Sequence, residues 1–523
     1  MRKIAVTAVG CVIALGGAAL AQQNAVQAAA KALNLDTTYS LQISGSGANF
    51  TVGQPYTAGG PWPRVNVKSF TESVNLDTAS LRIDMVREMP NPIPPGGGVA
   101  FAGEQTQNLF VSGNFAWAGL PPAPPMPDPN ARGGGAAAPA RGAAAGAGRG
   151  PAAAPPPPAG PAPLPEATVT ERKIWYWSIP QAFVKGAIAN NATSRKVGAN
   201  TVVSFTANNK YKLEGTFNAA NDLIDVKGWA PSPIFGDMLI ETAYSDYKDF
   251  GGVRFPGHIV QSEGGQPSLD ITVTAVRRNP VVSVIIPETV YAPAAAAAPD
   301  TVASQEVAPG VFYLTGGSHH SAAIAMKDHI VIVDLPLTPE RGAAVIAKAK
   351  ELIPNKPVRY VVNTHVHFDH SSGLRAGVAE GATIVTHESN RAFYAKQLAV
   401  RSTMMADKSA GKPVKLQGVG AHGTLTDGTR RIELYQITPN NHNAGFLMVY
   451  LPADKVLFEA DLYTPAAAGA PAPTAPNPNA QALADAIAKL KLDVATILPA
   501  HGPRTATMAD LNAVAAVGRR SGN

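Results

Sequence analysis

Cysteine is almost absent from the chain, since Cys11 is the only one among 523 residues. A single cysteine cannot form an intramolecular disulfide, and it cannot supply the paired thiolates of zinc fingers or iron–sulfur sites. The cysteine count therefore excludes a disulfide-stapled scaffold and a metal site built from several cysteines.

Charged side chains are also scarce, at 15% of the residues, whereas soluble domains carry about 25%. The net charge is only +6, and basic residues occur at most in adjacent pairs. Nucleic-acid-binding domains usually carry a basic stripe or patch. We therefore predict no nucleic-acid partner.

Long apolar runs are missing outside the N-terminus. Met1-Arg2-Lys3 precedes an apolar run from Ile4 to Leu20, and an A-x-A site at 19–21 is followed by polar Gln22. This is the three-part pattern of a secretory signal peptide. We predict a signal peptide over 1–21 and a periplasmic or secreted mature protein with no integral membrane segment.

Two alternatives compete with cleavage after Ala21. A membrane anchor is disfavoured because the run is short and rich in glycine and alanine. Lipoprotein anchoring at Cys11 would use residues 8–11 as a lipobox, but it would leave an apolar stretch of only about six residues. Cleavage after Ala21 removes Cys11, so the mature protein is expected to contain no cysteine.

Glycine and proline are abundant instead, with 49 and 46 residues, and they are concentrated locally. In the segment 121–165, 38 of 45 positions are proline, alanine or glycine. Such a segment cannot bury enough apolar surface to offset the entropy cost of ordering, so we predict a disordered insertion. Residues 291–303 are predicted to be a linker and 464–480 a long loop. These segments divide the mature chain into an N-terminal domain (22–290) and a C-terminal domain (304–523).

The N-terminal domain shows mostly alternating apolar and polar residues, as at 39–43, 80–85, 201–205 and 269–275. This period predicts a mainly antiparallel β domain, with one helix near 179–189. Residues 247–258 and the strand after them resemble the curved antiparallel sheets of periplasmic lipoprotein-carrier-like domains. No catalytic motif is present, so we predict an accessory role.

The C-terminal domain alternates strands with helices. The sequence predicts a helix over Pro339–Leu352, with Thr338 as its N-cap, and a final helix over 508–517 that ends at Gly518. Strands are predicted at 310–315, 322–326, 330–333, 358–363, 382–386, 432–437, 446–451, 456–459 and 495–498. This pattern is typical of an α/β domain with two sheets between helices.

Histidines and aspartates recur where these strands meet loops. The motif H-x-H-x-D-H contains His365, His367, Asp369 and His370 directly after one strand. Three more candidates, His442, Asp461 and His501, stand beside the ends of later strands. Side chains at such positions can converge over one sheet edge.

In type, order and spacing these seven residues resemble the metallo-β-lactamase-fold hydrolases, and Asp334 matches a structural aspartate of that family. The resemblance covers about residues 305–510 and implies an αββα sandwich with a two-metal cleft. It implies that His365, His367 and His442 bind one metal, that Asp369, His370 and His501 bind the second, and that Asp461 bridges both. Ala460 and Asn441 depart from the residues common in the family, without removing a ligand.

Imidazole and carboxylate ligands without sulfur suit two Zn²⁺ ions, with Fe or Mn as alternatives. Such a pair activates a hydroxide that attacks an ester, lactone, lactam or similar bond of a small-molecule substrate, with Asp369 as the catalytic residue that orients it. Two other hypotheses stay open: a mononuclear-iron redox enzyme of the persulfide dioxygenase type, and a non-catalytic periplasmic ligand-binding protein. The sequence leaves the oligomeric state open.

Overall fold

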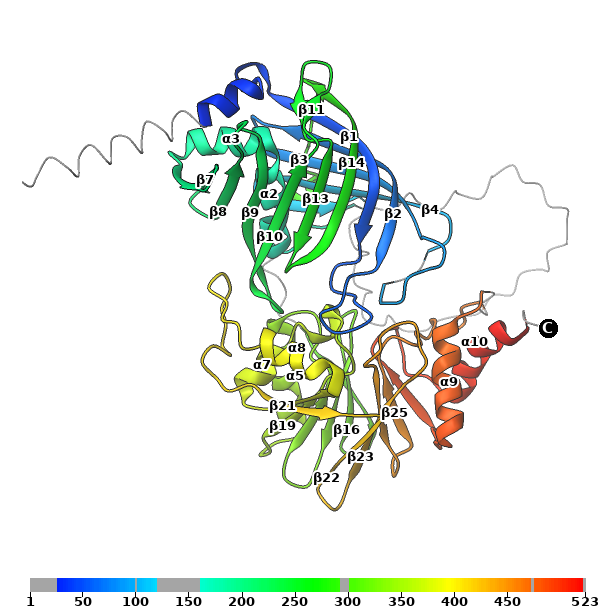
Figure 1. Cartoon of the computed structure of the whole chain (residues 1–523). Helices are drawn as coiled ribbons and strands as arrows, with labels where there is room; N and C mark the ends of the chain where they lie inside the picture. Colours follow the sequence, from blue (N-terminus) through cyan, green and yellow to red (C-terminus); the bar gives the residue numbers. More distant parts are fainter. Residues whose placement is uncertain (1–25, 99–100, 120–159, 292–300, 472–474, 521–523) are drawn as a thin grey trace, which may run out of the picture.

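The computed structural model describes residues 26–98, 101–119, 160–291, 301–471 and 475–520. The predicted signal peptide, most of the predicted insertion and most of the predicted linker lie outside these residues. Figure 1 shows the N-terminal part of the chain, in blue to green, above the C-terminal part, in yellow-green to red. Within the described residues, no helix has both the length and the apolar character needed to cross a membrane.

The N-terminal part is built on one antiparallel sheet of twelve strands, in the order β5-β4-β3-β2-β1-β14-β13-β10-β9-β8-β7-β6. Its strands are β1 Ser40–Phe50, β2 Arg64–Asn75, β3 Ser80–Glu88, β4 Glu104–Ser112, β5 Phe115–Ala118, β6 Thr193–Val197, β7 Asn200–Ala207, β8 Tyr211–Phe217, β9 Leu223–Ser232, β10 Gly236–Ser245, β13 His258–Glu263 and β14 Gln266–Arg278. Smaller elements are η1 Leu35–Thr37, β11 Lys248–Asp249, β12 Arg254–Phe255 and α4 Glu288–Tyr291. The predicted antiparallel β character is confirmed.

Two helices, α2 (Glu166–Ser178) and α3 (Pro180–Ala189), pack against this sheet. The prediction of a single helix near 179–189 found α3 and missed α2. The second half of α2 is rich in aromatic residues, which favour strands when read without their context. Burial of Ile174 and Tyr176 in the sheet's core outweighs that preference.

The C-terminal part contains two sheets, which lie side by side in Figure 1. The seven-stranded sheet contains β15 Ala303–Ala308, β16 Val311–Thr315, β17 Ser321–Ala325, β18 Ile330–Val333, β19 Val358–Val362, β20 Thr383–His387 and β21 Lys415–Val419. The five-stranded sheet contains β22 His422–Thr426, β23 Arg431–Gln436, β24 Leu447–Leu451, β25 Val456–Glu459 and β26 Thr496–Pro499. The helices are α5 Pro339–Leu352, α6 Phe368–Ser371, α7 Leu374–Glu380, α8 Glu388–Gln397, α9 Pro478–Leu490 and α10 Met508–Arg520.

The central strand β18 of the seven-stranded sheet is buried on both faces. In β18, Val331 and Val333 join the core shared with the five-stranded sheet, while Ile330 and Ile332 join a second core with α5 and α7. A continuous apolar run is what a strand covered on both faces requires. The buried faces hold the strand ends rigidly, and the loops that leave those ends carry the predicted ligands.

Most predicted elements of this part are found within one residue of their predicted bounds. Thr338 caps α5, since its hydroxyl oxygen accepts a hydrogen bond from the Arg341 backbone amide at 3.0 Å. The prediction that the last helix ends at Gly518 was wrong, because α10 continues to Arg520. Strands β15, β21 and β22 were missed because their residues are largely exposed and lack a clear apolar period.

Candidate metal centre

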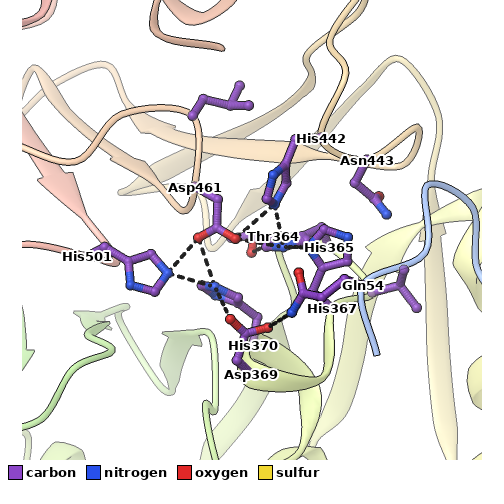
Figure 2. Close-up of polar contacts among 12 residues, drawn as sticks. Gln54, Thr364, His365, His367, Asp369, His370, His442, Asn443, Asp461 and His501 are labelled. Carbon is purple, nitrogen blue, oxygen red and sulfur yellow. Dashed lines mark hydrogen bonds and ion pairs between the residues drawn. The ribbon is translucent and has the colours of Figure 1, made fainter. Parts of the chain in front are cut away.

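All seven predicted ligand residues converge on one edge of the C-terminal sheets (Figure 2). The H-x-H-x-D-H motif leaves β19 and enters the short helix α6. Of the other three, His442 lies in the loop between β23 and β24, and Asp461 and His501 follow β25 and β26. The strand ends therefore bring together residues that are up to 136 positions apart in the sequence.

The first group consists of His365, His367, His442 and Asp461, whose ligand atoms lie within 4.8 Å of one another. The His365 Nε2 atom is 2.9 Å from His367 Nδ1 and 3.3 Å from His442 Nε2. The Asp461 Oδ2 atom is 3.2 Å from His365 Nε2 and 2.8 Å from His442 Nε2. Three imidazoles and one carboxylate oxygen thus face a common centre.

The second group consists of His319, Asp369, His370 and His501. The Nε2 atoms of His370 and His501 are 3.2 Å apart. Asp369 Oδ2 lies 3.8 Å from His370 Nε2 and accepts a hydrogen bond from His319 Nε2 at 3.1 Å. His319 was not among the predicted ligands, because a histidine in a turn carries no strand-end signal of its own.

Asp461 connects the two groups. Its Oδ1 atom is 2.9 Å from His370 Nε2 and 2.7 Å from His501 Nε2, while Oδ2 faces the first group. Burial acts to raise the pKa of this carboxyl, but the imidazoles of His370, His365 and His442 hold the pKa well below its ordinary value. Asp461 is therefore an anion placed between two sets of nitrogen atoms.

His365, His367 and His370 are fully buried, and their pKa values are shifted in opposite directions. Burial lowers the pKa of His365 to about 4, and it lowers the pKa of His367 well below its usual range. For His370, burial also acts to lower the pKa, but the carboxylates of Asp461 and Asp369 raise it well above the ordinary value. Neutral imidazoles are the form that binds a metal, so His365 and His367 are already suited to that role.

The donor atoms fit a divalent cation. Four ligands at about 2.0–2.1 Å from a tetrahedral zinc ion lie about 3.3 Å from one another, close to the spacing within the first group. Asp461 Oδ1 is buried and has no conventional hydrogen-bond donor in the described part of the chain. Nitrogen and oxygen donor atoms that converge at this spacing are an arrangement that a divalent cation would satisfy.

Comparison with known proteins agrees with this geometry. Residues 314–501 match the family model of the metallo-beta-lactamase superfamily. The C-terminal domain belongs to this superfamily. A search of curated proteins gave no match.

Several solved structures match a similar share of the chain. A metallo-beta-lactamase from Pontibacter korlensis is 22% identical with a TM-score of 0.32, and the match covers 42% of this chain and 99% of that one. The DIM-1 metallo-beta-lactamase is 16% identical with a TM-score of 0.33 over 42% and 98% of the two chains. The mono-zinc form of FIM-1 from Pseudomonas aeruginosa is 18% identical with a TM-score of 0.34, and the match covers 43% of this chain and 98% of that one.

Asp334 fixes the orientation of the candidate ligand His370 through a hydrogen bond. Its Oδ2 atom accepts a hydrogen bond from His370 Nδ1 at 3.1 Å, which leaves Nε2 facing Asp461. The other oxygen accepts from the Thr364 backbone amide at 2.8 Å, next to His365. Asp334 has a φ of 57°, in the left-handed region, where aspartate is tolerated better than most residues. A carboxylate behind a ligand histidine fixes its tautomer and ring orientation.

The N-terminal part reaches into this centre through the loop that follows β1. Gln54 Nε2 donates a hydrogen bond to Asp369 Oδ1 at 2.8 Å, as Figure 2 shows. The Pro55 carbonyl accepts hydrogen bonds from His367 Nε2 and from Asn443 Nδ2, both at 3.1 Å. His367 is held in the same way as His370, except that its acceptor comes from a residue 312 positions away.

Nearby backbone contacts hold that loop in place. The Gly53 carbonyl accepts from the Phe368 amide at 3.1 Å, and the Tyr56 carbonyl accepts from the Ala444 amide at 2.8 Å. Gly97 lies so close to His367 that a Cβ atom there would be 2.4 Å from the imidazole ring. A separate contact is made by Asp237, which accepts a hydrogen bond from the Thr403 amide at 2.8 Å. The N-terminal part therefore forms one wall of the metal centre.

Proposed function

We propose that the chain is an exported, binuclear metal-dependent hydrolase that acts on an ester, lactone, lactam or similar bond of a small molecule. The observation that carries the proposal is the position of Asp461, whose two oxygens each face a separate group of imidazole nitrogens at 2.7–3.2 Å. Export is inferred from the N-terminal sequence over 1–21. A four-layer αββα arrangement agrees with the two cores on either side of the seven-stranded sheet.

Two divalent cations are assigned to the two groups. His365, His367 and His442 would hold the first, and Asp369, His370 and His501 the second, with Asp461 shared between them. When bound, such ions polarise the oxygen of the bond to be cleaved and lower the pKa of a water molecule toward 7. The sulfur-free donor set favours Zn²⁺, with Fe or Mn as alternatives.

Asp369 is the residue placed to handle the proton of the attacking water. Burial acts to raise its pKa, but His370 and the hydrogen bond from His319 hold the pKa well below the ordinary value. The carboxylate is therefore ionised at neutral pH and can accept a hydrogen bond from water. Its side chain is 30% exposed, so a substrate can reach it. We assign Asp369 the role of orienting the water and accepting its proton at a carboxylate oxygen.

The neighbouring residues keep this carboxylate in one orientation. Gln54 donates to Oδ1 and His319 donates to Oδ2, so both oxygens have a fixed partner. The Pro55 carbonyl and Asp334 hold the rings of His367 and His370 from behind. Such preorganisation lowers the cost of reaching the transition state, because the groups need not reorient during the reaction.

Metal analysis of the purified mature chain, combined with a hydrolysis panel of ester, lactone and β-lactam substrates, tests the proposal. We expect two zinc equivalents per chain and turnover that a chelator abolishes and zinc restores. One iron per chain with consumption of O₂ would instead establish the redox alternative. A protein that binds two metals and cleaves none of the panel would contradict the proposed hydrolysis of these bonds.

The Gln54→Ala variant tests whether the N-terminal part supports the centre. Removal of the amide leaves Asp369 Oδ1 without its donor, and loss of such supporting contacts weakens metal binding by about 10-fold or more. We expect a weaker affinity for the second zinc ion, measured by competition with a chromophoric chelator. Gln305→Ala, at an exposed position of β15, is the matched control. Equal affinities for the two variants would show that the contact does not support the ligand.

A further inference from the structure

The N-terminal part contains a cavity of about 340 Å³ that is separate from the metal centre. It lies between the sheet and α2, with walls from β2, β3, β4, β10 and β13. Helix α2 packs against β4 and β10 of this sheet (Figure 1). The volume is within the range of small-molecule sites, which span about 300–1,000 Å³.

Several polar groups in the cavity wall are buried and have no hydrogen-bond partner among the described residues. Glu72 as a residue is 8% exposed, and no described residue forms a hydrogen bond or an ion pair with its carboxyl. Thr242 Oγ1 and Arg172 Nε are also buried without a hydrogen-bond partner in the described part of the chain. Buried polar groups in native proteins are nearly always satisfied. Their number in one cavity points to a molecule that supplies the missing partners.

The charges of the wall indicate which molecule fits. Three carboxyls line the cavity, from Glu72, Glu171 and Glu263, and two guanidinium groups accompany them. Burial raises the pKa of both Glu72 and Glu263 to about 7. Burial also raises the pKa of Glu171, with a further contribution from the neighbouring Glu263. A positive charge placed among these carboxyls would stabilise their ionised forms.

The two guanidinium groups do not neutralise these carboxyls by direct contact. Arg172 Nη1 donates to the carbonyl of Phe110 at 2.8 Å. Arg87 donates to the side chain of Gln105. Among the described residues, neither arginine forms an ion pair with a carboxyl of the cavity. The carboxyls are therefore available to a bound molecule, and Glu72 is the most buried of them without a partner in the described part of the chain.

The rest of the wall is apolar or aromatic. Phe70, Trp175, Tyr244 and Phe255 line the cavity beside the carboxyls. The Tyr244 hydroxyl is already used, since it donates to the Ser178 carbonyl. Aromatic faces attract cations and also cover apolar surface. Aromatic walls of this kind are known to bind organic ammonium groups.

We propose that this cavity binds a small organic amine in its ammonium form, with Glu72 as an acceptor of its N–H groups and the apolar walls around its carbon skeleton. The site is independent of the proposed hydrolysis, because none of its lining residues is a candidate metal ligand. It is nevertheless joined to the metal centre by the chain itself. Thr51 and Val52 line the cavity, and Gln54 contacts Asp369 two residues later.

Calorimetric titration of the full mature chain with cyclohexylamine and cyclohexanol tests the proposal, since the two probes have the same ring and differ in charge. We expect one cyclohexylamine to bind per chain, at least 10-fold more tightly than cyclohexanol. Glu72→Gln should lower the affinity for the amine at least 10-fold and leave the affinity for the alcohol unchanged. Glu241→Gln, on the same sheet but outside the cavity lining, should change neither affinity.

A bound ammonium group, a bound neutral molecule and a cavity that holds only water give different results in this titration. Equal affinities for the amine and the alcohol would overturn the assignment of a cation, and binding of neither would indicate a cavity that holds only water. The comparison of the two probes on the unmodified protein remains decisive even if Glu72→Gln folds poorly, and Glu263→Gln provides a second variant. Because binding is measured without turnover, failure of this proposal is distinguishable from failure of the proposed hydrolase function.

Discussion

The Asp461→Asn variant is expected to lose zinc from both groups and to lose hydrolysis by about 10³-fold or more. An asparagine side chain offers one neutral oxygen and one amide nitrogen, whereas Asp461 presents one anionic oxygen to each group. The interactions at stake supply several kcal/mol of transition-state stabilisation. A loss of about 4 kcal/mol corresponds to about 10³-fold in rate.

Zinc content and kcat/KM are measured on the same preparations. Asp493→Asn is the matched control, because the Asp493 side chain is 73% exposed and forms a surface ion pair with Lys455. Thermal unfolding of both variants shows whether the fold is kept. Two zinc ions retained by Asp461→Asn would contradict the bridging position, whatever the effect on rate.

The ligand residues were predictable because their signal is local and specific. Four of them stand in six consecutive positions after a buried strand, and such a combination of histidine and aspartate is rare by chance. The strand itself is marked by the β-branched and aromatic residues at 358 and 360–362, which are interrupted only by Arg359. Since the ends of neighbouring strands meet at one edge, the order of His442, Asp461 and His501 along the chain was enough to place them together.

The wall formed by the N-terminal part could not be predicted in the same way. Gln54 and Pro55 are ordinary residue types in a loop with no catalytic motif, and their partners are more than 300 positions away. No period or spacing in the sequence relates two segments so far apart. The pairing of β1 with β14, which joins the first and the last strand of the N-terminal sheet in chain order, is a long-range contact of the same kind.

The cavity could not be predicted from the sequence for a different reason. Glu72 lies in a strand whose alternation places it on the buried face, between Phe70 and Val74. Taken alone, a glutamate at such a position is only an exception to the apolar pattern. Its role in the cavity becomes visible only together with Glu171 and Glu263, which come from a helix and from a distant strand. Only the packed structure brings the three carboxyls to one cavity.

The Asp369→Asn variant is expected to reduce hydrolysis by about 10²–10³-fold while keeping one zinc ion. The asparagine cannot accept the proton of the attacking water, and a well-placed general base contributes about 10²–10⁴-fold. Asp369 belongs only to the second group, so the first group, with His365, His367 and His442, should retain its ion. This stoichiometry distinguishes the variant from Asp461→Asn, which should lose both ions.

A spectroscopic readout separates the two roles of Asp369. Cobalt(II) replaces zinc, and its visible spectrum reports the first group, where three imidazoles lie around Asp461 Oδ2. In Asp369→Asn that spectrum should persist while turnover falls, and the exposed Asp493→Asn should alter neither. Retention of full activity by Asp369→Asn would remove it from the proposed mechanism. Loss of the first-group spectrum would instead show that Asp369 holds the whole centre together, because the two groups then depend on each other through Asp461.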